Sequence, residues 1–315
     1  MTSTSPAPIE LVEVAPRDGF QSIADPLPTA RKIEVIQALL DAGIRRMEIG
    51  SFVSPRAIPQ MADTGELIRA FAHRRDVRFS ALVPNLKGAE LALEHDVSEL
   101  VYVVSVSEAH NRNNVRQSVD ESLAAFARVV EAVRAKGNTA LRLDLGTSFD
   151  CPFDGRVDWR RVDEVLTKAL AITGELPVEV ALCDTTGRAT PFQVADHFTE
   201  LTERHRSPAL SWAFHGHDTF GMGVANALFA ARHGAAALDA ACAGLGGCPF
   251  APGATGNTAS EDLVYALQGG GMAGDIDLGA LLHAADLIAA LPGGTTESHL
   301  RRVPREGLAG ADAGA

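Results

Sequence analysis

The 315-residue chain has few cysteines, no long apolar run and no excess of positive charge. Its four cysteines include no Cys-x-x-Cys pair and are too sparse for a disulfide scaffold, which predicts reduced thiols. No apolar run reaches the length that a membrane span requires. The N-terminus lacks the basic and apolar regions of a signal peptide. We therefore expect a cytoplasmic protein that does not associate with membranes.

Negative charge predominates, with a formal net charge of −12. This excess argues against nucleic acid or an anionic membrane as the main partner. A phosphate-bearing ligand needs only a local basic patch, so it remains compatible with the composition. Hydrophobic residues make up 46% and charged residues 22% of the chain, which is typical of a globular enzyme.

Segments with strand-like and helix-like patterns alternate along the chain and predict a parallel (β/α)8 barrel, a TIM barrel. The eight expected strands span residues 9–14, 46–49, 77–83, 100–106, 139–145, 178–182, 209–214 and 237–242. The expected helices that follow them span residues 29–41, 60–73, 87–94, 120–136, 157–173, 191–204, 222–233 and 260–268. An open doubly wound sheet is the alternative, but no Gly-x-Gly-x-x-Gly follows the first strand.

We expect one catalytic domain over residues 9–291, which includes an additional C-terminal helix over 277–291. Residues 1–8 are expected to form a flexible N-terminus, and residues 292–315 a loose tail. In a barrel of this kind, chemistry gathers at the C-terminal ends of the strands and in the loops that follow them.

Polar residues follow five of the expected strands at this end. Each cluster alone is unremarkable for a surface turn, but five at corresponding positions predict a functional site. They contain Arg17 and Asp18 after the first strand, Glu48 on the second, Asp184 after the sixth, His215 and His217 after the seventh, and Cys248 and Asn257 in a glycine-rich loop after the eighth.

The two histidines suggest a metal site. His215 and His217 are spaced i, i+2 at the end of an extended segment, so their side chains point the same way. Asp18 offers a carboxylate and Asn257 a neutral oxygen. A ligand set of nitrogen and oxygen without thiolates favours Mg2+ or Mn2+ over structural Zn2+. Such an ion keeps positions open for substrate and acts as a Lewis acid. The alternative interpretation is that this His-x-His spacing is accidental or structural.

The cysteines divide by context. Cys248 lies among glycines in a loop that could fold over the barrel mouth and act in proton transfer. Cys183 and Cys242 are expected to pack in the interior, as free cysteines usually do. Cys151 has no assigned role.

These motifs resemble the 3-hydroxy-3-methylglutaryl-CoA (HMG-CoA) lyases, metal-dependent TIM-barrel enzymes. The resemblance lies in residues 13–21, 51–63, 214–221 and 243–257, continues through 261–265, and extends over about residues 9–291. Isopropylmalate and homocitrate synthases share the Arg-Asp and His-x-His elements. The Gly-Gly-Cys-Pro loop at 246–249 favours the lyases over such condensing synthases.

The resemblance implies a reaction and a role for each residue. The expected reaction cleaves the C2–C3 bond of HMG-CoA to acetyl-CoA and acetoacetate by retro-Claisen chemistry. The implied roles are metal binding by Asp18, His215, His217 and Asn257, enolate stabilisation by Arg17, proton transfer by Cys248, and shaping of the site by Glu48 and Asp184. The base at the C3 hydroxyl is expected to be either His215 or Asp184.

Several positions depart from the family pattern. Residues 22–24 read Ser-Ile-Ala where the family usually has Asn-Glu-Lys, and Gly216 stands where many relatives have Cys. These changes leave a citramalyl-CoA or a longer-branched 3-hydroxyglutaryl-CoA open as the substrate; a non-catalytic ligand-binding barrel is a remote alternative. Arg112 and Arg116 either bind the phosphates of coenzyme A or lie in a solvated loop. We expect an acyl-CoA substrate and a homo-oligomer, a dimer.

Overall fold

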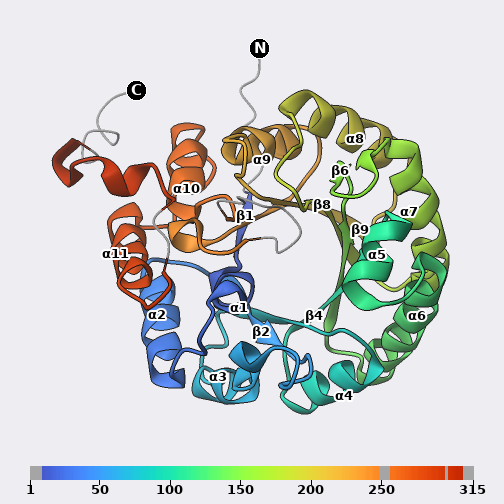
Figure 1. Ribbon diagram of the computed structural model, residues 1–315, viewed down its shortest axis with the longest axis horizontal. Coiled ribbons are helices and arrows are strands. Elements are labelled where there is room, and N and C mark those ends of the chain that lie inside the picture. The colour runs from blue at the N-terminus through green and yellow to red at the C-terminus, as the bar shows by residue number, and fades with distance from the viewer. Residues whose placement is uncertain (1–8, 248–255, 295–296, 308–315) are drawn as a thin grey trace.

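The computed structural model describes residues 9–247, 256–294 and 297–307, and its eight main strands close into a parallel barrel (Figure 1). The strands pair in the order β1-β10-β9-β8-β5-β4-β3-β2. Their bounds are β1 (Glu10–Glu13), β2 (Arg46–Ser51), β3 (Arg78–Leu82), β4 (Glu99–Ser105), β5 (Ala140–Gly146), β8 (Val178–Asp184), β9 (Leu210–Gly216) and β10 (Ala237–Ala240). The predicted TIM barrel is confirmed.

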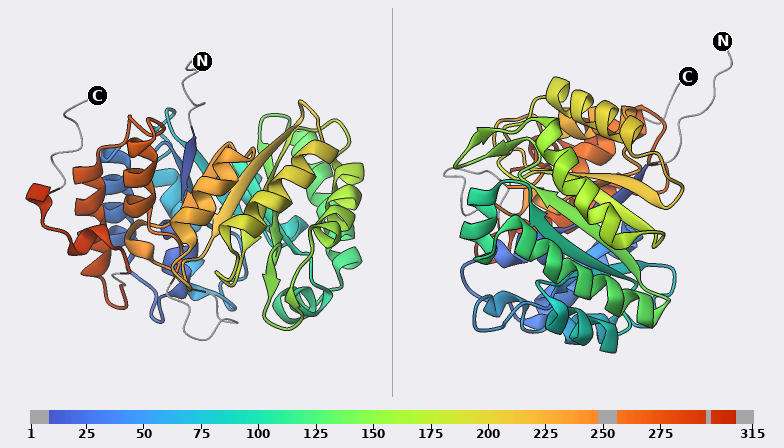
Figure 2. Two further views of the ribbon diagram at one scale, coloured as in Figure 1. Left: turned by 90° about the horizontal axis from the view of Figure 1, so that it is seen from above. Right: turned by 90° about the vertical axis from the view of Figure 1, so that its right-hand side faces the viewer.

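A ring of helices surrounds the strands. It consists of α2 (Thr29–Asp41), α3 (Thr64–Ala70), α4 (Leu86–Glu94), α6 (Val119–Lys136), α7 (Trp159–Thr173), α8 (Pro191–Arg204), α9 (Gly223–Arg232) and α10 (Ser260–Gly269). The additional helix α11 (Leu278–Ala289) packs against α2 and α10, as the views in Figure 2 also show. No helix within the described residues is long and apolar enough to cross a membrane.

Local sequence explains where the longest helix begins and ends. Ser118 caps the N-terminus of α6 in a reciprocal capping box with Glu121, which satisfies backbone N–H groups that have no partner within the helix. Gly137 ends the helix with φ of 80°, a left-handed conformation that glycine adopts at low cost. Between these ends, Phe126, Val129 and Val130 are buried toward the sheet.

The short elements at the C-terminal ends of the strands were not predicted. A π-helix (Ala15–Gly19) and α1 (Phe20–Ser22) follow β1, α5 (Glu108–Val115) follows β4, and a hairpin of β6 (Asp150–Cys151) and β7 (Gly155–Arg156) follows β5. The helix expected over residues 60–73 is wrong in its first turn. A 3-10 turn (Pro59–Met61) occurs there, and Asp63 has a non-helical backbone (φ −98°, ψ 9°) before α3.

The inside of the barrel is charged, whereas bulky apolar residues usually fill the interior of a TIM barrel. Near the N-terminal ends of the strands, the buried Arg46 contacts Glu10, Glu99 and Glu179. Closer to the C-terminal ends, Arg142 contacts Asp144, Asp239 and Glu179. Each arginine is thus paired with several carboxylates, which offsets the cost of removing the charges from water. The apolar core lies between the sheet and the helices.

Candidate active site

Three side chains that can bind a metal meet at the C-terminal end of the barrel. Asp18 belongs to the π-helix after β1, His215 lies in β9, and His217 directly follows β9. One ligand atom from each lies within 4.8 Å of the others. The two imidazole rings are 5.2 Å apart at an interplanar angle of 69°, so they converge without stacking. The structure therefore brings together three of the four predicted ligands in one cluster.

Asn257 joins this cluster from the loop before α10. Its Nδ2 donates to Asp18 Oδ2 at 2.7 Å and to the carbonyl of Leu245 at 3.0 Å. Asn257 Oδ1 and His217 Nδ1 are buried and have no hydrogen-bond partner among the described residues. Because buried polar atoms are almost always satisfied in native proteins, these atoms fit a site that holds a cation. A carboxylate, two imidazoles and an amide oxygen are also a suitable donor set for Mg2+ or Mn2+.

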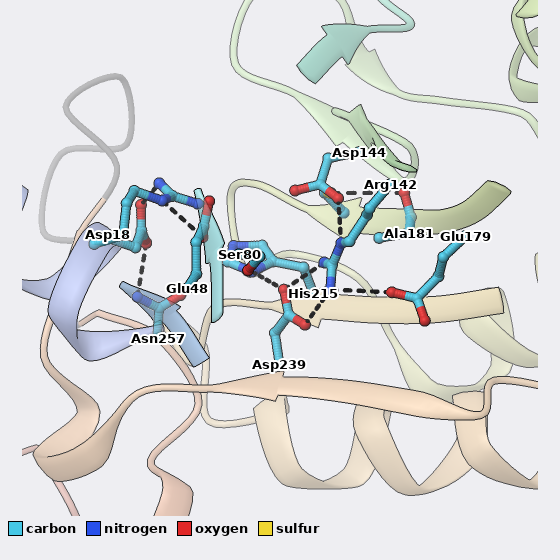
Figure 3. Close-up of polar contacts among 12 residues, drawn as sticks. Asp18, Glu48, Ser80, Arg142, Asp144, Glu179, Ala181, His215, Asp239 and Asn257 are labelled. Atoms are coloured by element: carbon cyan, nitrogen blue, oxygen red, sulfur yellow. Dashed lines mark hydrogen bonds and ion pairs between the residues drawn. The ribbon is translucent and has the colours of Figure 1, made fainter. Parts of the chain in front are cut away.

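A hydrogen bond that His215 donates to Asp239 orients the imidazole ring. The Nδ1 atom of His215 lies 3.1 Å from Asp239 Oδ2, which leaves Nε2 as the ring atom that can bind a cation. Asp239 in turn accepts two hydrogen bonds from Arg142, at 2.9 and 2.6 Å. Burial tends to lower the pKa of His215, but its hydrogen bond to Asp239 and the nearby negative charges outweigh this effect and raise it. Figure 3 shows this chain of contacts.

Arg17 connects Glu48 to the cluster of Asp18, His215 and His217, called the metal cluster below because its side chains could hold a metal ion. Its Nε donates to Glu48 Oε2 at 2.8 Å, and its Nη1 contacts Asp18 Oδ1. Burial tends to raise the pKa of Asp18, but Arg17 and the two histidines lower it to about 2. Asp18 is therefore an anion at neutral pH and suited to bind a cation. For Glu48, burial outweighs the Arg17 charge and raises the pKa to about 7.

Asp184 lies apart from the cluster. Its carboxylate accepts hydrogen bonds from the backbone N–H groups of Arg188 and Ala189, both at 3.1 Å, and so holds the loop after β8. Cys183, the preceding residue, faces the opposite side of the strand, and the charge of Asp144 adds to burial in raising its pKa well above the ordinary value. The structure thus places Cys183, and not Asp184, toward the charged interior of the barrel.

The remaining predicted residues have varied positions. Cys248 lies outside the described residues. Arg112 is exposed on α5 and forms an ion pair with Glu108 at 2.7 Å, and Arg116 ends α5 in a left-handed conformation. The structure brings neither arginine to the metal cluster, so their contact with coenzyme A stays a prediction. Cys183 and Cys242 are buried, as expected.

Two buried carboxyl groups hold the start of the loop that carries Asn257. Glu13 Oε1 accepts from the backbone N–H of Cys242 at 2.9 Å, and Glu261 Oε2 accepts from that of Ala243 at 3.1 Å. Burial raises the pKa of each carboxyl group to about 7. Glu261 Oε1 has no partner among the described residues. Protonation of these groups near neutral pH is therefore linked to the free energy of folding.

The sequence patterns did not identify three charged residues that lie beside the site: Arg142, Asp144 and Asp239. A signal was present, because Arg142 and Asp144 are spaced i, i+2 in a strand whose other residues are apolar, and Asp239 lies within another such strand. Charged residues are rarely buried unless they are paired, so charges inside buried strands predict partners across the barrel. Those partners follow from the closed topology and not from spacing along the chain.

Known proteins with similar sequence and structure agree with this site. The HMGL-like family model matches residues 8–288. The chain is 41% identical to (R)-citramalyl-CoA lyase of Chloroflexus aurantiacus, over 90% of this chain and 91% of that protein. It is also 41% identical to the 3-hydroxy-3-isohexenylglutaryl-CoA/hydroxymethylglutaryl-CoA lyase of Pseudomonas aeruginosa, over 91% and 94% of the two chains.

A solved structure extends the comparison to three dimensions. The HMG-CoA lyase of Acinetobacter baumannii, in complex with coenzyme A and 3-methylmalate, superposes with a TM-score of 0.87 at 38% identity. The match covers 100% of this chain and 99% of that one. The resemblance predicted from the Arg-Asp, His-x-His and Gly-Gly-Cys-Pro motifs is confirmed. The chain belongs to the HMGL-like family and is a carbon–carbon lyase.

Proposed function

We propose that this lyase cleaves the C2–C3 bond of HMG-CoA to yield acetyl-CoA and acetoacetate, and that it depends on a divalent cation. The observation that carries the proposal is the convergence of Asp18, His215 and His217 beside the Arg17 guanidinium. Acyl-CoA lyases at about the same identity as the citramalyl-CoA enzyme support the substrate class.

The site provides what a retro-Claisen cleavage requires. Mg2+ or Mn2+ held by the three clustered side chains and by Asn257 would polarise the oxygen atoms of the substrate. Arg17 supplies a fixed positive charge for the enolate oxygen of the departing acetyl-CoA, and loss of one such donor typically lowers the rate ~10²–10³-fold. Its bonds to Asp18 and Glu48 hold the guanidinium in place. Cys248 is proposed to protonate C2 of the enolate.

A second acyl group is supported by one relative. The (R)-citramalyl-CoA lyase is as similar to this chain as the P. aeruginosa enzyme, whose name includes a longer-branched substrate. All three substrates are 3-hydroxyacyl thioesters that release acetyl-CoA, so the same residues serve each. We further propose that Arg112 and Arg116 bind the phosphates of coenzyme A, and that the enzyme is a cytoplasmic homodimer.

Product release from a panel of substrates tests the function. The protein is incubated with Mg2+ and HMG-CoA, citramalyl-CoA or a longer-branched 3-hydroxyglutaryl-CoA, and acetyl-CoA is measured by chromatography. We expect the highest kcat/KM for HMG-CoA and loss of turnover in EDTA, with recovery on added Mg2+ or Mn2+. A higher value for citramalyl-CoA would reassign the acyl group. No acetyl-CoA from any of the three would refute the proposed function.

A further inference from the structure

The proposed cleavage requires a base for the C3 hydroxyl proton, and the two predicted candidates are engaged elsewhere. His215 shares its Nδ1 hydrogen with Asp239, and its other ring nitrogen belongs to the metal cluster. Asp184 accepts from two backbone N–H groups in the loop after β8. Neither contact pattern leaves a group free to take a proton from substrate.

Glu48, in contrast, has a carboxylate oxygen that makes no hydrogen bond with the described residues. Its side chain extends from β2 into the barrel, where Oε2 accepts from Arg17 Nε at 2.8 Å. Oε1 is buried and has no hydrogen-bond partner among the described residues. A buried carboxylate oxygen without a donor is costly, so the site favours a group that brings a hydrogen to this atom.

Glu48 is linked through Arg17 to the metal cluster, where the substrate is proposed to react. One guanidinium, that of Arg17, contacts both Glu48 and the metal ligand Asp18. Figure 3 shows Glu48 among the polar side chains at this end of the barrel, together with Asp18 and Asn257. Burial raises the pKa of Glu48 to about 7, helped by the nearby charge of Asp144 and opposed by Arg17. A carboxyl group that exchanges its proton near neutral pH is suited to act as a general base.

We propose that Glu48 Oε1 is the general base that removes the proton from the C3 hydroxyl of the substrate, an inference that rests on the proposed lyase function. As the O–H bond breaks, its electrons form the C3 carbonyl, and the C2–C3 bond pair passes to the thioester as an enolate beside Arg17. A general acid then protonates C2 to give acetyl-CoA. Glu48 then passes its proton back to the deprotonated general acid, either directly or through solvent that takes one proton from Glu48 and gives one to the acid, which restores both groups to their starting states.

Glu48→Gln separates this role from that of holding Arg17, because the amide oxygen can still accept from Arg17 Nε. Three quantities are measured: single-turnover cleavage of HMG-CoA, exchange of the acetyl-CoA methyl protons in D2O by NMR, and Mn2+ affinity by calorimetry. The exchange reaction forms the enolate from acetyl-CoA, which has no C3 hydroxyl. The matched control is Glu99→Gln, which neutralises another buried, arginine-paired glutamate near the opposite end of the barrel.

We expect Glu48→Gln to lower cleavage ~10²–10⁴-fold, the usual range for loss of a general base. Methyl exchange and Mn2+ affinity should stay within about threefold of wild type, and Glu99→Gln should keep all three. Near-normal cleavage would overturn the inference. A parallel loss of exchange would show that Glu48 acts by positioning Arg17, and a loss of Mn2+ affinity would make it a metal ligand; either would overturn it. If wild type neither cleaves nor exchanges, the proposed function itself fails.

Discussion

Replacing Asp239 with asparagine tests whether the charged interior of the barrel tunes the metal site. Asp239 Oδ1 accepts from Arg142 Nη1 at 2.9 Å, and Oδ2 accepts from Arg142 Nη2 at 2.6 Å and from His215 Nδ1 at 3.1 Å. All three residues are buried. Asparagine has one accepting oxygen, so in either orientation its NH2 group faces a hydrogen of Arg142. With the oxygen in the place of Oδ2, His215 keeps a hydrogen bond but loses the negative charge of its partner.

The contacts of Asp239 allow us to estimate the effect of this substitution on stability and on metal affinity. Removing one partner of a buried ion pair typically costs ~3–5 kcal/mol. Arg142 keeps Asp144 at 2.6 Å and Glu179 at 3.5 Å, so we expect the lower end, about 3 kcal/mol in the free energy of unfolding. His215 then faces a neutral acceptor in place of a carboxylate, and loss of such a partner usually weakens metal affinity ~10–100-fold.

The stability is measured by urea denaturation without metal, and the affinity by Mn2+ calorimetry. Asp144→Asn is the matched control, because Asp144 also contacts Arg142 but makes no hydrogen bond with His215. We expect the control to lose stability and to keep its Mn2+ affinity within about threefold of wild type. Equal Mn2+ affinity in Asp239→Asn and wild type would refute the reasoning, since the negative charge of Asp239 beside His215 would then contribute nothing to Mn2+ binding.

Three further predictions follow from the site. His217→Ala should weaken Mn2+ binding in calorimetry, and unchanged affinity would remove His217 from the ligand set. Cys248→Ala should retain Mn2+ affinity and lose ~10²–10⁴ in turnover, as expected for loss of a general acid; near-normal turnover would reject its role. Burial raises the pKa of Glu261 from 4.5 to about 7, so the folded state holds a proton that the unfolded state has released between these pH values. This group lowers stability as pH rises, by about 3 kcal/mol above pH 7, and Glu261→Gln should remove that loss. Urea denaturation at pH 5 and pH 8 measures it, and an equal fall in stability in both proteins would contradict the prediction.

The fold and the clustering of Asp18, His215 and His217 were predictable because each depends on spacing along the chain. Alternating strand and helix patterns specify a parallel barrel, and the closed topology then brings the ends of β1 and β9 to the same mouth. His215 and His217 share a side because strand residues alternate. Asp18 could be assigned to the same site because β1 and β9 end at the same mouth of the barrel.

The rim elements were not predictable from the same patterns. Helix α5 has no apolar stripe of the kind that identifies a surface helix, and its sequence contains four asparagines or arginines in succession. Its contacts are tertiary: Asn111 accepts from the backbone N–H of Ser105 and donates to Ser122 Oγ. These contacts join α5 to β4 and α6, which flank it along the chain, so they form only when that strand and that helix are in place.

The charged interior and the metal site form one structure. His215 is oriented by Asp239, Asp239 is held by Arg142, and Arg142 shares Glu179 with Arg46 near the other end of the barrel. An apolar filling of the same volume would avoid the cost of burying these charges, and replacing buried ion pairs by apolar groups is often neutral or stabilising. It would leave His215 without an acceptor for Nδ1, and the ring would be free to choose its tautomer and rotamer. The contact between Asp239 and Arg142 therefore fixes the orientation of His215, the candidate metal ligand.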